Sequence, residues 1–273
     1  MKKLYCVIGN PIAHSLSPAM HTALLEQNKL DASYVPFLLN KASFTPAVEG
    51  LKALGVSGFN VTSPFKEAIL PFLDQLDSEA AACGAVNTVV VKEGRWLGYN
   101  TDGVGYLQGL QNIRPITEND QILVLGAGGA SKAIYHALKH HTNASLTVAN
   151  RTLEKAMKMV EGPGHQAMSL VEAESQIANF TIIIQTTSVG LTKENAELPI
   201  RLHDLTAGTI VSDIIYNPSE TPFLKEAKIY GAITQNGLPM FVNQAAIAFQ
   251  LWTGIEADRE LMRNTVLKQL GGK

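Results

Sequence analysis

Residues 122–138 read ILVLGAGGASKAIYHAL, and this stretch decides the fold. Four large apolar residues, typical of a buried strand, run directly into Gly126, Gly128 and Gly129, after which a helical pattern begins. In a dinucleotide-binding fold the first glycine permits a tight turn, the second lets the backbone approach a pyrophosphate, and the helix N-terminus supplies N–H donors. Ser131 stands where the G-x-G-x-x-G pattern has its third glycine, so a glycine-rich turn without a ligand is the alternative interpretation.

Short apolar runs alternate with helical patterns on both sides of this turn, which predicts the α/β class with mostly parallel sheets covered on both faces. The residues GRW at 94–96 indicate a hairpin. Strands are predicted at residues 4–9, 32–39, 56–62, 85–91, 96–100, 122–125, 145–150, 181–187 and 209–215. Helices are predicted at residues 18–28, 44–55, 65–76, 103–112, 130–141, 152–162, 221–231, 239–254 and 256–270.

The polar segment RPITEND at 114–120 interrupts the alternation and indicates two domains. We expect an open, mostly parallel α/β domain formed by residues 1–102 and 238–273, because the two final helices have no strand after them and can return to it. Residues 103–237 are expected to form a Rossmann-type, doubly wound domain.

Composition argues against several classes of protein. The chain has 273 residues, of which 46% are hydrophobic and 17% charged, with a formal net charge of −2. This content supports a large core but gives no broad basic field for nucleic acid, and no apolar stretch approaches the length of a membrane span. The apolar run of the N-terminus breaks at Asn10 and Pro11, too early for a signal peptide, so we expect a cytoplasmic protein.

The cysteines point to neither a metal nor a disulfide. Cys6 lies in an apolar run and Cys83 among small residues, so both are predicted to be buried thiols in a reducing compartment. No Cys/His group has metal-ligand spacing, and His14, which stands alone beside a turn, is interpreted as structural. No G-x-S-x-G turn is present, so serine-hydrolase chemistry has no support.

The strand after the glycine turn indicates which dinucleotide is bound. Sites that prefer NAD end this strand with an acidic residue, whereas here it ends with Asn150, Arg151 and Thr152, and Lys155 follows one turn later. A guanidinium offers a fork of donors that suits a phosphate dianion, which favours NADP(H). The alternative is a helix N-cap at Asn150 or Thr152 with two solvated cations.

Polar side chains gather at predicted strand ends of the first domain, where a parallel sheet would bring them to one edge. This inventory of hydroxyls, amides, one ammonium and one carboxylate suits a small polyhydroxylated ligand. Its members are Ser15, Ser17, Asn60, Thr62, Lys66, Asn87, Thr101 and Asp102.

Lys66 and Asp102 form a candidate proton relay. A carboxylate can orient the ammonium, and the pair can exchange a proton with an alcohol or ketone while a nicotinamide carries the hydride. In the alternative interpretation Asp102 caps the following helix and Lys66 is a solvated residue.

These residues, in this order, make the chain similar to the shikimate dehydrogenase family, whose members reduce 3-dehydroshikimate to shikimate with NADPH. The resemblance extends from Ile8 to Gly254. It rests on IGNPIAHSLSPAMH (8–21), GFNVTSPFK (58–66), GAVNTVV (84–90), GYNTDGVGY (98–106), LGAGGAS (125–131), NRT (150–152), DIIYNPSETPFL (213–224) and NGLPMFVNQAAIAFQLWTG (236–254).

The resemblance implies a role for individual residues. It makes Lys66 and Asp102 the catalytic pair, with Lys66 the proton donor to the carbonyl oxygen. The implied substrate-binding residues are Ser15 and Ser17 for the carboxylate, then Asn60, Thr62, Asn87, Gln244 and, across the cleft, Tyr216. The implied NADP contacts are Gly126, Ala127, Gly128, Gly129 and Ala130 at the pyrophosphate, Asn150, Arg151, Thr152 and Lys155 at the 2′-phosphate, Thr187, and Ile214 and Gly237 near the nicotinamide. Gln185 stands where members of the family often have an asparagine, two residues before Thr187.

Two other functions fit the same motifs. One is a quinate/shikimate dehydrogenase with broader use of substrates; two serines at the carboxylate turn and the Asn-Arg-Thr segment favour the stricter enzyme. The other is a non-catalytic sensor of NADPH or a cyclic acid, which would not need both Lys66 and Asp102. We expect the substrate to be a small molecule and the chain to act as a monomer or homodimer, without nucleic acid, membrane or metal.

Overall fold

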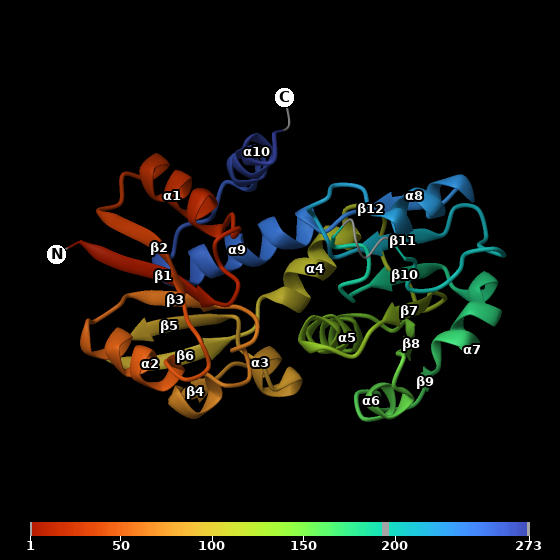
Figure 1. Cartoon of the computed structure of the whole chain (residues 1–273), viewed down its shortest axis with the longest axis horizontal. Coiled ribbons are helices and arrows are strands. Elements are labelled where there is room, and N and C mark those ends of the chain that lie inside the picture. Colours follow the sequence, from red (N-terminus) through yellow and green to blue (C-terminus); the bar gives the residue numbers. More distant parts are fainter. Residues whose placement is uncertain (1, 193–196, 272–273) are drawn as a thin grey trace. The chain divides into compact units, whose positions relative to one another are not determined.

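Two units, each built on a six-stranded sheet, make up residues 2–192 and 197–271, the part of the chain that the computed structural model describes (Figure 1). Unit 1 comprises Met1–Gly105 and Val242–Lys273, and unit 2 comprises Tyr106–Phe241. The chain passes from one unit to the other within two helices, α4 (Asp102–Gln111) and α9 (Leu238–Thr253). The boundaries expected from sequence fall at the first turns of these helices.

The sheet of unit 1 has the strand order β2-β1-β3-β5-β6-β4 and mixes parallel with antiparallel pairs. β1 pairs in parallel with β2 and β3, and β4 with β6, whereas β5 runs antiparallel to β3 and β6. Its strands are β1 (Lys3–Gly9), β2 (Ala32–Leu38), β3 (Gly58–Val61), β4 (Gln75–Leu76), β5 (Thr88–Lys92) and β6 (Arg95–Tyr99). Its further helices are α1 (Ser17–Gln27), α2 (Phe44–Ala53), α3 (Ser78–Cys83) and α10 (Arg259–Gln269).

The turn predicted at GRW is confirmed as a two-residue hairpin. Lys92 pairs with Arg95, and the two residues between them, Glu93 and Gly94, have φ angles of 53° and 77°. Positive φ at both central positions is the requirement of a tight turn that matches the twist of the strands.

The helix predicted at residues 65–76 is wrong. This segment instead forms turns, a short 3₁₀ helix (Leu70–Phe72) and β4. Pro71 lacks the N–H that an α-helix would need at that position, so the helical pattern cannot continue through it. The apolar spacing that suggested a helix is used to bury Phe65 and Ile69 in the core of unit 1.

Helix α9 is tied to the sheet of unit 1 through Trp252. Its indole N–H donates to the carbonyl of Val89 at 2.9 Å, and its ring stacks on Tyr5 with a centroid distance of 5.1 Å. Gly58 makes room for the indole, since a Cβ at this position would lie 2.5 Å from Trp252 Nε1. The hydrogen bond offsets the desolvation of the indole N–H, so the ring can contribute its packing.

The sheet of unit 2 is fully parallel, with the order β12-β11-β10-β7-β8-β9. Read from β7 in chain order this is the doubly wound arrangement of dinucleotide-binding folds, and the order reverses between β7 and β10. Its strands are β7 (Gln121–Leu125), β8 (Ser145–Ala149), β9 (His165–Met168), β10 (Ile182–Gln185), β11 (Ile210–Asp213) and β12 (Ile233–Gln235). The further helices are α5 (Gly129–His141), α6 (Leu153–Met157), α7 (Leu170–Ser175) and α8 (Pro222–Ile229), with a 3₁₀ turn at Ile177–Asn179.

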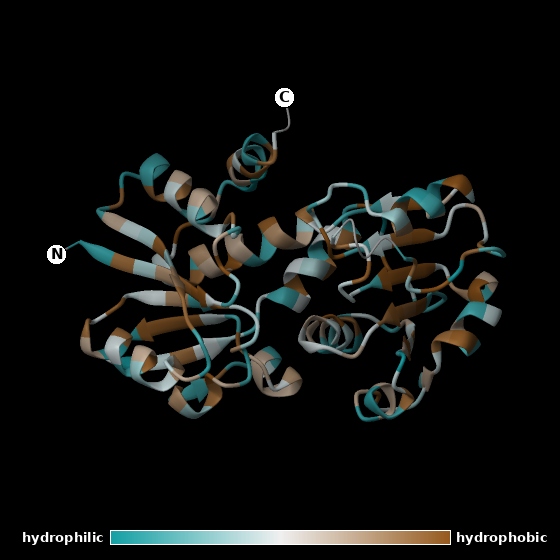
Figure 2. Cartoon of the chain, viewed as in Figure 1, coloured by the Kyte–Doolittle hydropathy of each residue, from teal (hydrophilic) through white to brown (hydrophobic). Residues whose placement is uncertain are grey.

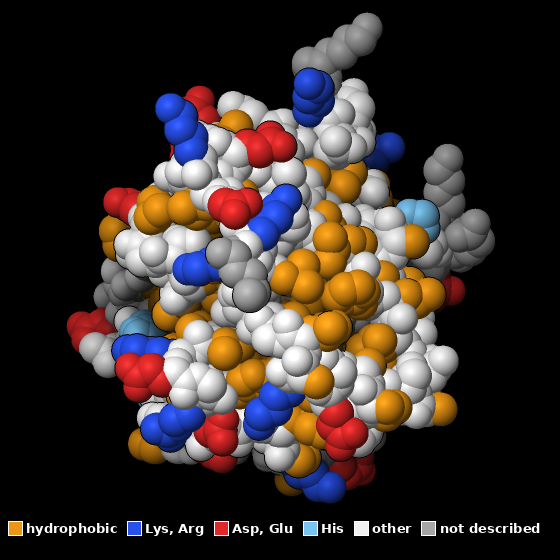
Figure 3. Space-filling view, turned by 90° about the vertical axis from the view of Figure 1, so that its left-hand side faces the viewer, with side chains coloured by type: hydrophobic (Ala, Val, Ile, Leu, Met, Phe, Trp, Pro, Cys, Tyr) orange, Lys and Arg blue, Asp and Glu red, His pale blue; other side chains and the backbone are white. Residues whose placement is uncertain are grey.

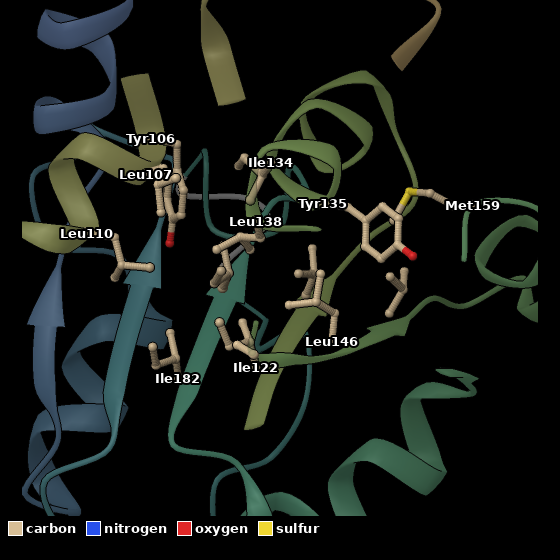
Figure 4. Packing of buried hydrophobic residues seen from close by; sticks show 14 of the residues in the cluster. Tyr106, Leu107, Leu110, Ile122, Ile134, Tyr135, Leu138, Leu146, Met159 and Ile182 are labelled. Carbon is tan, nitrogen blue, oxygen red and sulfur yellow. The ribbon is translucent and has the colours of Figure 1, made fainter. Parts of the chain in front are cut away.

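Apolar side chains cover both faces of this sheet. One cluster packs Leu110 of α4 and Leu138 of α5 against Ile122, Leu146 and Ile182 of the strands (Figure 4). A second cluster fills the opposite face with residues that include Leu123 and Phe223. Figure 2 shows the resulting pattern, in which the strands of unit 2 are largely hydrophobic and the outer helices carry polar stretches.

Two short α-helices, α3 and α7, and two short strands, β9 and β12, fall in segments where the sequence predicted no element. Each is only three to six residues long. Local hydrogen bonds define two of them, because Asp77 caps α3 and Ser169 forms a capping box with Glu172 at the start of α7. The helix predicted at 152–162 is confirmed only as α6, which ends at Met157.

The surface carries both signs of charge. On the face of unit 1 in Figure 3, basic and acidic side chains are interspersed around hydrophobic ones, without a block of one sign. Cys6 and Cys83 are free and buried, as predicted, and burial raises the pKa of Cys6 to about 12. Among the helices of the described residues, none has both the length and the apolar character needed to span a bilayer.

Asp213, the last residue of β11, closes the connection to α8. Its carboxylate accepts from the Ile215 N–H at 2.9 Å and from the Thr221 hydroxyl at 2.8 Å, and Thr221 in turn caps α8. The side chain is fully buried. Burial raises the pKa of Asp213 to about 6, although both donors act in the opposite direction.

We predict that replacing this carboxyl group changes how stability depends on pH. The folded chain keeps the Asp213 proton up to about pH 6, whereas the unfolded chain releases it near the ordinary value of 3.8. Between these values the folded state binds more protons, so stability falls as pH rises. Relative to D213N, the parent should therefore lose about 2 kcal/mol of unfolding free energy between pH 4 and pH 7.

Urea denaturation of both proteins across this range measures the effect. Above about pH 7 the difference between them should be constant. A difference that is independent of pH, or that favours the parent more strongly as pH rises, would contradict the prediction.

Candidate functional site

The topology of unit 1 brings four polar segments to one edge of its sheet. β1, β3 and β6 run in the same direction, so the residues that follow them meet there, and β5, which is antiparallel, begins at the same edge. The order of the sheet reverses between β1 and β3, which is where open α/β sheets bind ligands. The segments that arrive at this edge are 10–17, 62–66, 85–88 and 100–102.

Lys66 and Asp102 form an ion pair at this edge. Lys66 Nζ lies 2.5 Å from Asp102 Oδ2, and the two side chains are 23% and 9% exposed. The carbonyl of Lys66 accepts the N–H of Val86, which fixes the backbone, and Asp102 is the first residue of α4. The pair predicted from sequence is therefore assembled, with the ammonium partly accessible and the carboxylate nearly buried.

The amide of Asn87 supports the carboxylate from the other side. Asn87 Nδ2 donates to Asp102 Oδ1 at 2.8 Å and to Thr101 Oγ1 at 2.9 Å. Its Oδ1 accepts the Thr101 N–H at 2.9 Å. The backbone N–H of Asp102 donates to Asn100 Oδ1 at 3.1 Å. Charge-assisted hydrogen bonds of this kind offset part of the desolvation of a buried carboxylate.

Asn60 is held just as firmly, one strand away. Its Nδ2 donates to the Asn87 carbonyl at 3.2 Å and to Thr88 Oγ1 at 3.0 Å, and its Oδ1 accepts from the Tyr34 hydroxyl at 2.6 Å. Both amide hydrogens of Asn60 are thus engaged within the protein, and its Oδ1 keeps one lone pair for a ligand.

The remaining substrate-side predictions fall into three places. Ser15 and Ser17 lie together at the start of α1, where the Ser17 N–H donates to Ser15 Oγ at 3.3 Å. Thr62 directly follows β3, and its methyl group would lie 2.3 Å from a Cβ at Gly9. Gln244 is in α9, where its carbonyl accepts the Thr101 hydroxyl at 3.0 Å.

The glycine turn of unit 2 follows β7 at the point where the strand order reverses. Gly126 has a φ of 112°, and a Cβ there would lie 2.6 Å from Thr186 Oγ1, so only glycine fits. Ser131, which replaces the third glycine, turns its hydroxyl back to the Gly126 carbonyl at 2.6 Å and is fully buried. Ser131 therefore stabilises the turn, and its side chain does not occupy the space outside it.

The outer side of this turn is open. A Cβ on Gly128 or Gly129 would meet no atom within 4 Å. Gly128 is the N-cap of α5, and the N–H groups of the first turn of a helix have no partner within the helix. Ala127 precedes this N-cap and Ala130 lies in the first turn. Such a backbone concavity at a helix N-terminus fits a pyrophosphate.

The three residues that follow β8, Asn150, Arg151 and Thr152, include a cation and no carboxylate, and α6 then adds Glu154 and Lys155. Asn150 Nδ2 donates to the Thr152 carbonyl at 2.9 Å, and Arg151, Thr152 and Lys155 are exposed. Thr152 is the N-cap of α6, but its side chain makes no capping hydrogen bond. Capping therefore does not account for the Thr152 side chain, and the segment offers the charged and polar donors that a phosphate group needs.

Gln185 organises the turn that carries Thr187. Its side chain accepts the Thr187 N–H at 2.9 Å and donates to the Val189 carbonyl at 3.1 Å. Thr187 Oγ1 in turn accepts the Val189 N–H at 3.2 Å. The longer side chain that departs from the family pattern is thus accommodated by bonds on both sides of the turn.

Ile214 and Gly237 are in direct contact in unit 2. A Cβ at Gly237 would lie 1.9 Å from the Ile214 carbonyl oxygen, and the Gly237 N–H donates to the Ile215 carbonyl at 2.9 Å. Tyr216 stacks on Phe241 with a centroid distance of 4.4 Å, and burial raises the pKa of its phenol. Tyr216 therefore keeps its proton near neutral pH.

Three residues of the polar edge were not identified from sequence: Tyr34, Thr88 and Asn100. Tyr34 bonds to Asn60, and Thr88 bonds to Asn60 and Asn87. Asn100 accepts the backbone N–H of Asp102. Their importance depends on the pairing register, in which Thr88 stands opposite Asn60. A single sequence does not reveal that register.

Three family descriptions match the chain. Residues 7–89 match "Shikimate dehydrogenase substrate binding domain", residues 110–205 match "Shikimate / quinate 5-dehydrogenase", and residues 237–267 match "Shikimate 5'-dehydrogenase C-terminal domain". The first and third fall largely in unit 1 and the second in unit 2.

Full-length relatives agree with these matches. The chain is 51% identical over 278 residues to a Bacillus anthracis protein named shikimate dehydrogenase (NADP(+)), with 100% of each chain covered. A solved shikimate dehydrogenase from Aquifex aeolicus is 41% identical, with a TM-score of 0.91 and 97% of each chain covered. A second, from Thermus thermophilus in complex with NADP(H) and shikimate, is 36% identical, with a TM-score of 0.88 over 97% of this chain and 99% of that one. The chain belongs to the shikimate dehydrogenase family.

Proposed function

We propose that this chain catalyses the reversible, NADPH-dependent reduction of 3-dehydroshikimate to shikimate, a step that supplies aromatic amino acid biosynthesis. The observation that carries the proposal is the Lys66–Asp102 pair, held at 2.5 Å at the polar edge of unit 1. Unit 1 is the substrate and catalytic domain, and unit 2 the cofactor domain. The bound nicotinamide supplies or accepts the hydride.

Lys66 handles the proton. During reduction its Nζ donates a proton to the carbonyl oxygen of the substrate, and during oxidation it takes the proton from the hydroxyl. Asp102 Oδ2 orients the ammonium group, while Asn87 keeps Oδ1 engaged and prevents the carboxylate from rotating. Partial exposure of Lys66 leaves the ammonium reachable by a ligand.

Recognition of the substrate uses the hydroxyls and amides around this pair. Ser15 and Ser17 bind its carboxylate, and the ring hydroxyls bind to groups that remain unsaturated, such as the second lone pair of Asn60 Oδ1. The other contacts are Thr62, Asn87, Gln244 and Tyr216.

The cofactor is held by the open glycine turn and the cationic segment after β8. The backbone at Gly126–Ala130 binds the pyrophosphate. Ile214 and Gly237 lie beside the nicotinamide, and Thr187 is a further contact of the cofactor. Arg151, with Asn150, Thr152 and Lys155, binds the 2′-phosphate that distinguishes NADP from NAD.

Replacing Lys66 with alanine should abolish most turnover. We expect kcat for shikimate oxidation to fall by at least ~100-fold, the scale of a lost general acid–base group. The KM for shikimate should change little, because the other polar groups stay in place. Nicotinamide absorbance follows the reaction.

Lys92→Ala is the matched control, because Lys92 is an exposed lysine at the end of β5. It should turn over like the parent. Normal turnover by K66A would refute the role of Lys66, and normal binding of shikimate and NADPH by a parent that never turns over would instead support a sensor.

Replacing Arg151 with alanine should weaken NADP⁺ binding selectively. Loss of charge-assisted hydrogen bonds to a phosphate should raise the KM for NADP⁺ by roughly 10- to 100-fold, whereas the KM for NAD⁺ should stay within about twofold. Arg201→Ala, an exposed arginine of the same unit, is the control. The proposal of NADP preference fails if the parent uses NAD⁺ as efficiently as NADP⁺.

Broader specificity is the second candidate, because residues 110–205 match a family described as both shikimate and quinate dehydrogenase. Rates with shikimate and quinate, each with NADP⁺ and NAD⁺, distinguish the two. Comparable turnover of quinate with NAD⁺ would favour the broader enzyme.

The setting of the reaction follows from the same proposal. Free, buried thiols at Cys6 and Cys83 fit a reducing compartment, which supports the cytoplasm. Every residue assigned a role belongs to one chain, so a monomer and a homodimer both fit.

A further inference from the structure

We propose that Thr88 is a positioning residue for the reaction, acting through Asn60 and Asn87 as the centre of a buried hydrogen-bond relay that begins at Tyr34 and ends at the Lys66–Asp102 pair. The inference rests on the proposed function, because the relay matters for turnover only if Lys66 and Asp102 perform the proton transfer. Thr88 is fully buried and touches no ligand itself.

The hydroxyl of Thr88 is the one link between the two asparagine side chains in the described bonds. It accepts from Asn60 Nδ2 at 3.0 Å and donates to Asn87 Oδ1 at 3.0 Å. A hydroxyl has a single hydrogen, so accepting on one side and donating on the other gives the relay a direction. Thr88 stands directly opposite Asn60 in the β3–β5 pairing, which places both side chains on the same face of the sheet.

Tyr34 fixes the far end of the relay. Its hydroxyl donates to Asn60 Oδ1 at 2.6 Å, and burial raises the pKa of this phenol far above its ordinary value, so it stays a donor. The ring stacks on His21 with a centroid distance of 4.4 Å. Burial lowers the pKa of His21 to about 3, so the imidazole is a neutral packing surface.

The near end of the relay delivers N–H groups to the reacting pair. Asn87 Oδ1 is occupied by Thr88 and by the Thr101 N–H, so its Nδ2 must face Asp102 Oδ1 and Thr101 Oγ1. With Oδ1 of Asp102 engaged, Oδ2 is the oxygen that faces Lys66. A mobile Asn87 would let the carboxylate rotate, and the lysine would lose its orientation toward the substrate oxygen.

The experiment compares kcat and KM in T88V, T88S, Y34F and the T88V/Y34F double variant. Valine has the shape of threonine without the hydroxyl, and serine keeps the hydroxyl. The control is T209V, because Thr209 is another buried threonine, in unit 2, whose hydroxyl donates only to the Phe180 carbonyl in the described bonds. Thermal midpoints confirm that each variant is folded under the assay conditions.

We expect T88V to lose roughly 10- to 100-fold in kcat, the cost of a small misplacement of a catalytic group, with the KM for NADP⁺ within about twofold of the parent. T88S should recover most of the lost rate, and T209V should match the parent. Y34F should lose less, roughly 3- to 10-fold, and the double variant should be close to T88V alone, because both hydroxyls act through one relay.

Three outcomes overturn the inference: a folded T88V with kcat within twofold of the parent, a T88S as slow as T88V, or effects of T88V and Y34F that multiply. If T88V does not fold, T88S and Y34F still test the inference. An unchanged kcat in Y34F would show that the first bond of the relay has no effect on turnover, which overturns the inference. A parent and a T209V that both fail to oxidise shikimate would instead overturn the proposed function.

Discussion

The nearly buried carboxylate of Asp102 is the constraint on which the polar edge of unit 1 depends. An ionised group at 9% exposure is tolerated only if its charge is paired and its lone pairs are satisfied. Lys66 supplies the charge, Asn87 supplies an N–H, and Asn100 anchors the backbone. Removing one partner of such a pair leaves an uncompensated charge, which is strongly destabilising. The hydrogen bonds of the surrounding amides keep the carboxylate in the position where both partners reach it.

Unit 2 meets a different constraint, the close approach of neighbouring backbone segments. At Gly126 a side chain would collide with Thr186, and at Gly237 it would collide with the Ile214 carbonyl. At Gly128 and Gly129 there is open space instead. The first pair of glycines lets neighbouring segments pack together, and the second pair leaves room above the helix N-terminus. Gly126 and Gly237 are thus required by the packing of neighbouring segments, whereas Gly128 and Gly129 keep the turn before α5 free of side chains.

Much of this arrangement could be predicted from the sequence, because the deciding signals are local. Apolar strands, the glycine turn and the turn at Glu93–Gly94 each depend on neighbouring residues, and they are found where expected. The segment 65–76 misled because its apolar spacing is helical while Pro71 forbids the helix. Short elements such as β9 and β12 have too few residues to show a period and form because neighbouring strands pair with them.

The site divides along the same line. Lys66 and Asp102 follow strands and could be placed at a sheet edge by topology alone, but Thr88 and Tyr34 could not, since their partners are set by register and by a contact that skips a strand. Lys66 and Asp102 are conspicuous in the sequence because they are charged residues close to the ends of apolar strands. Residues that orient them look like ordinary strand residues. The role of Thr88, at the start of a buried strand, depends on its hydrogen bonds to the Asn60 and Asn87 amides. A valine has the same shape and would fill the same space, so strand propensity and packing alone do not identify this role.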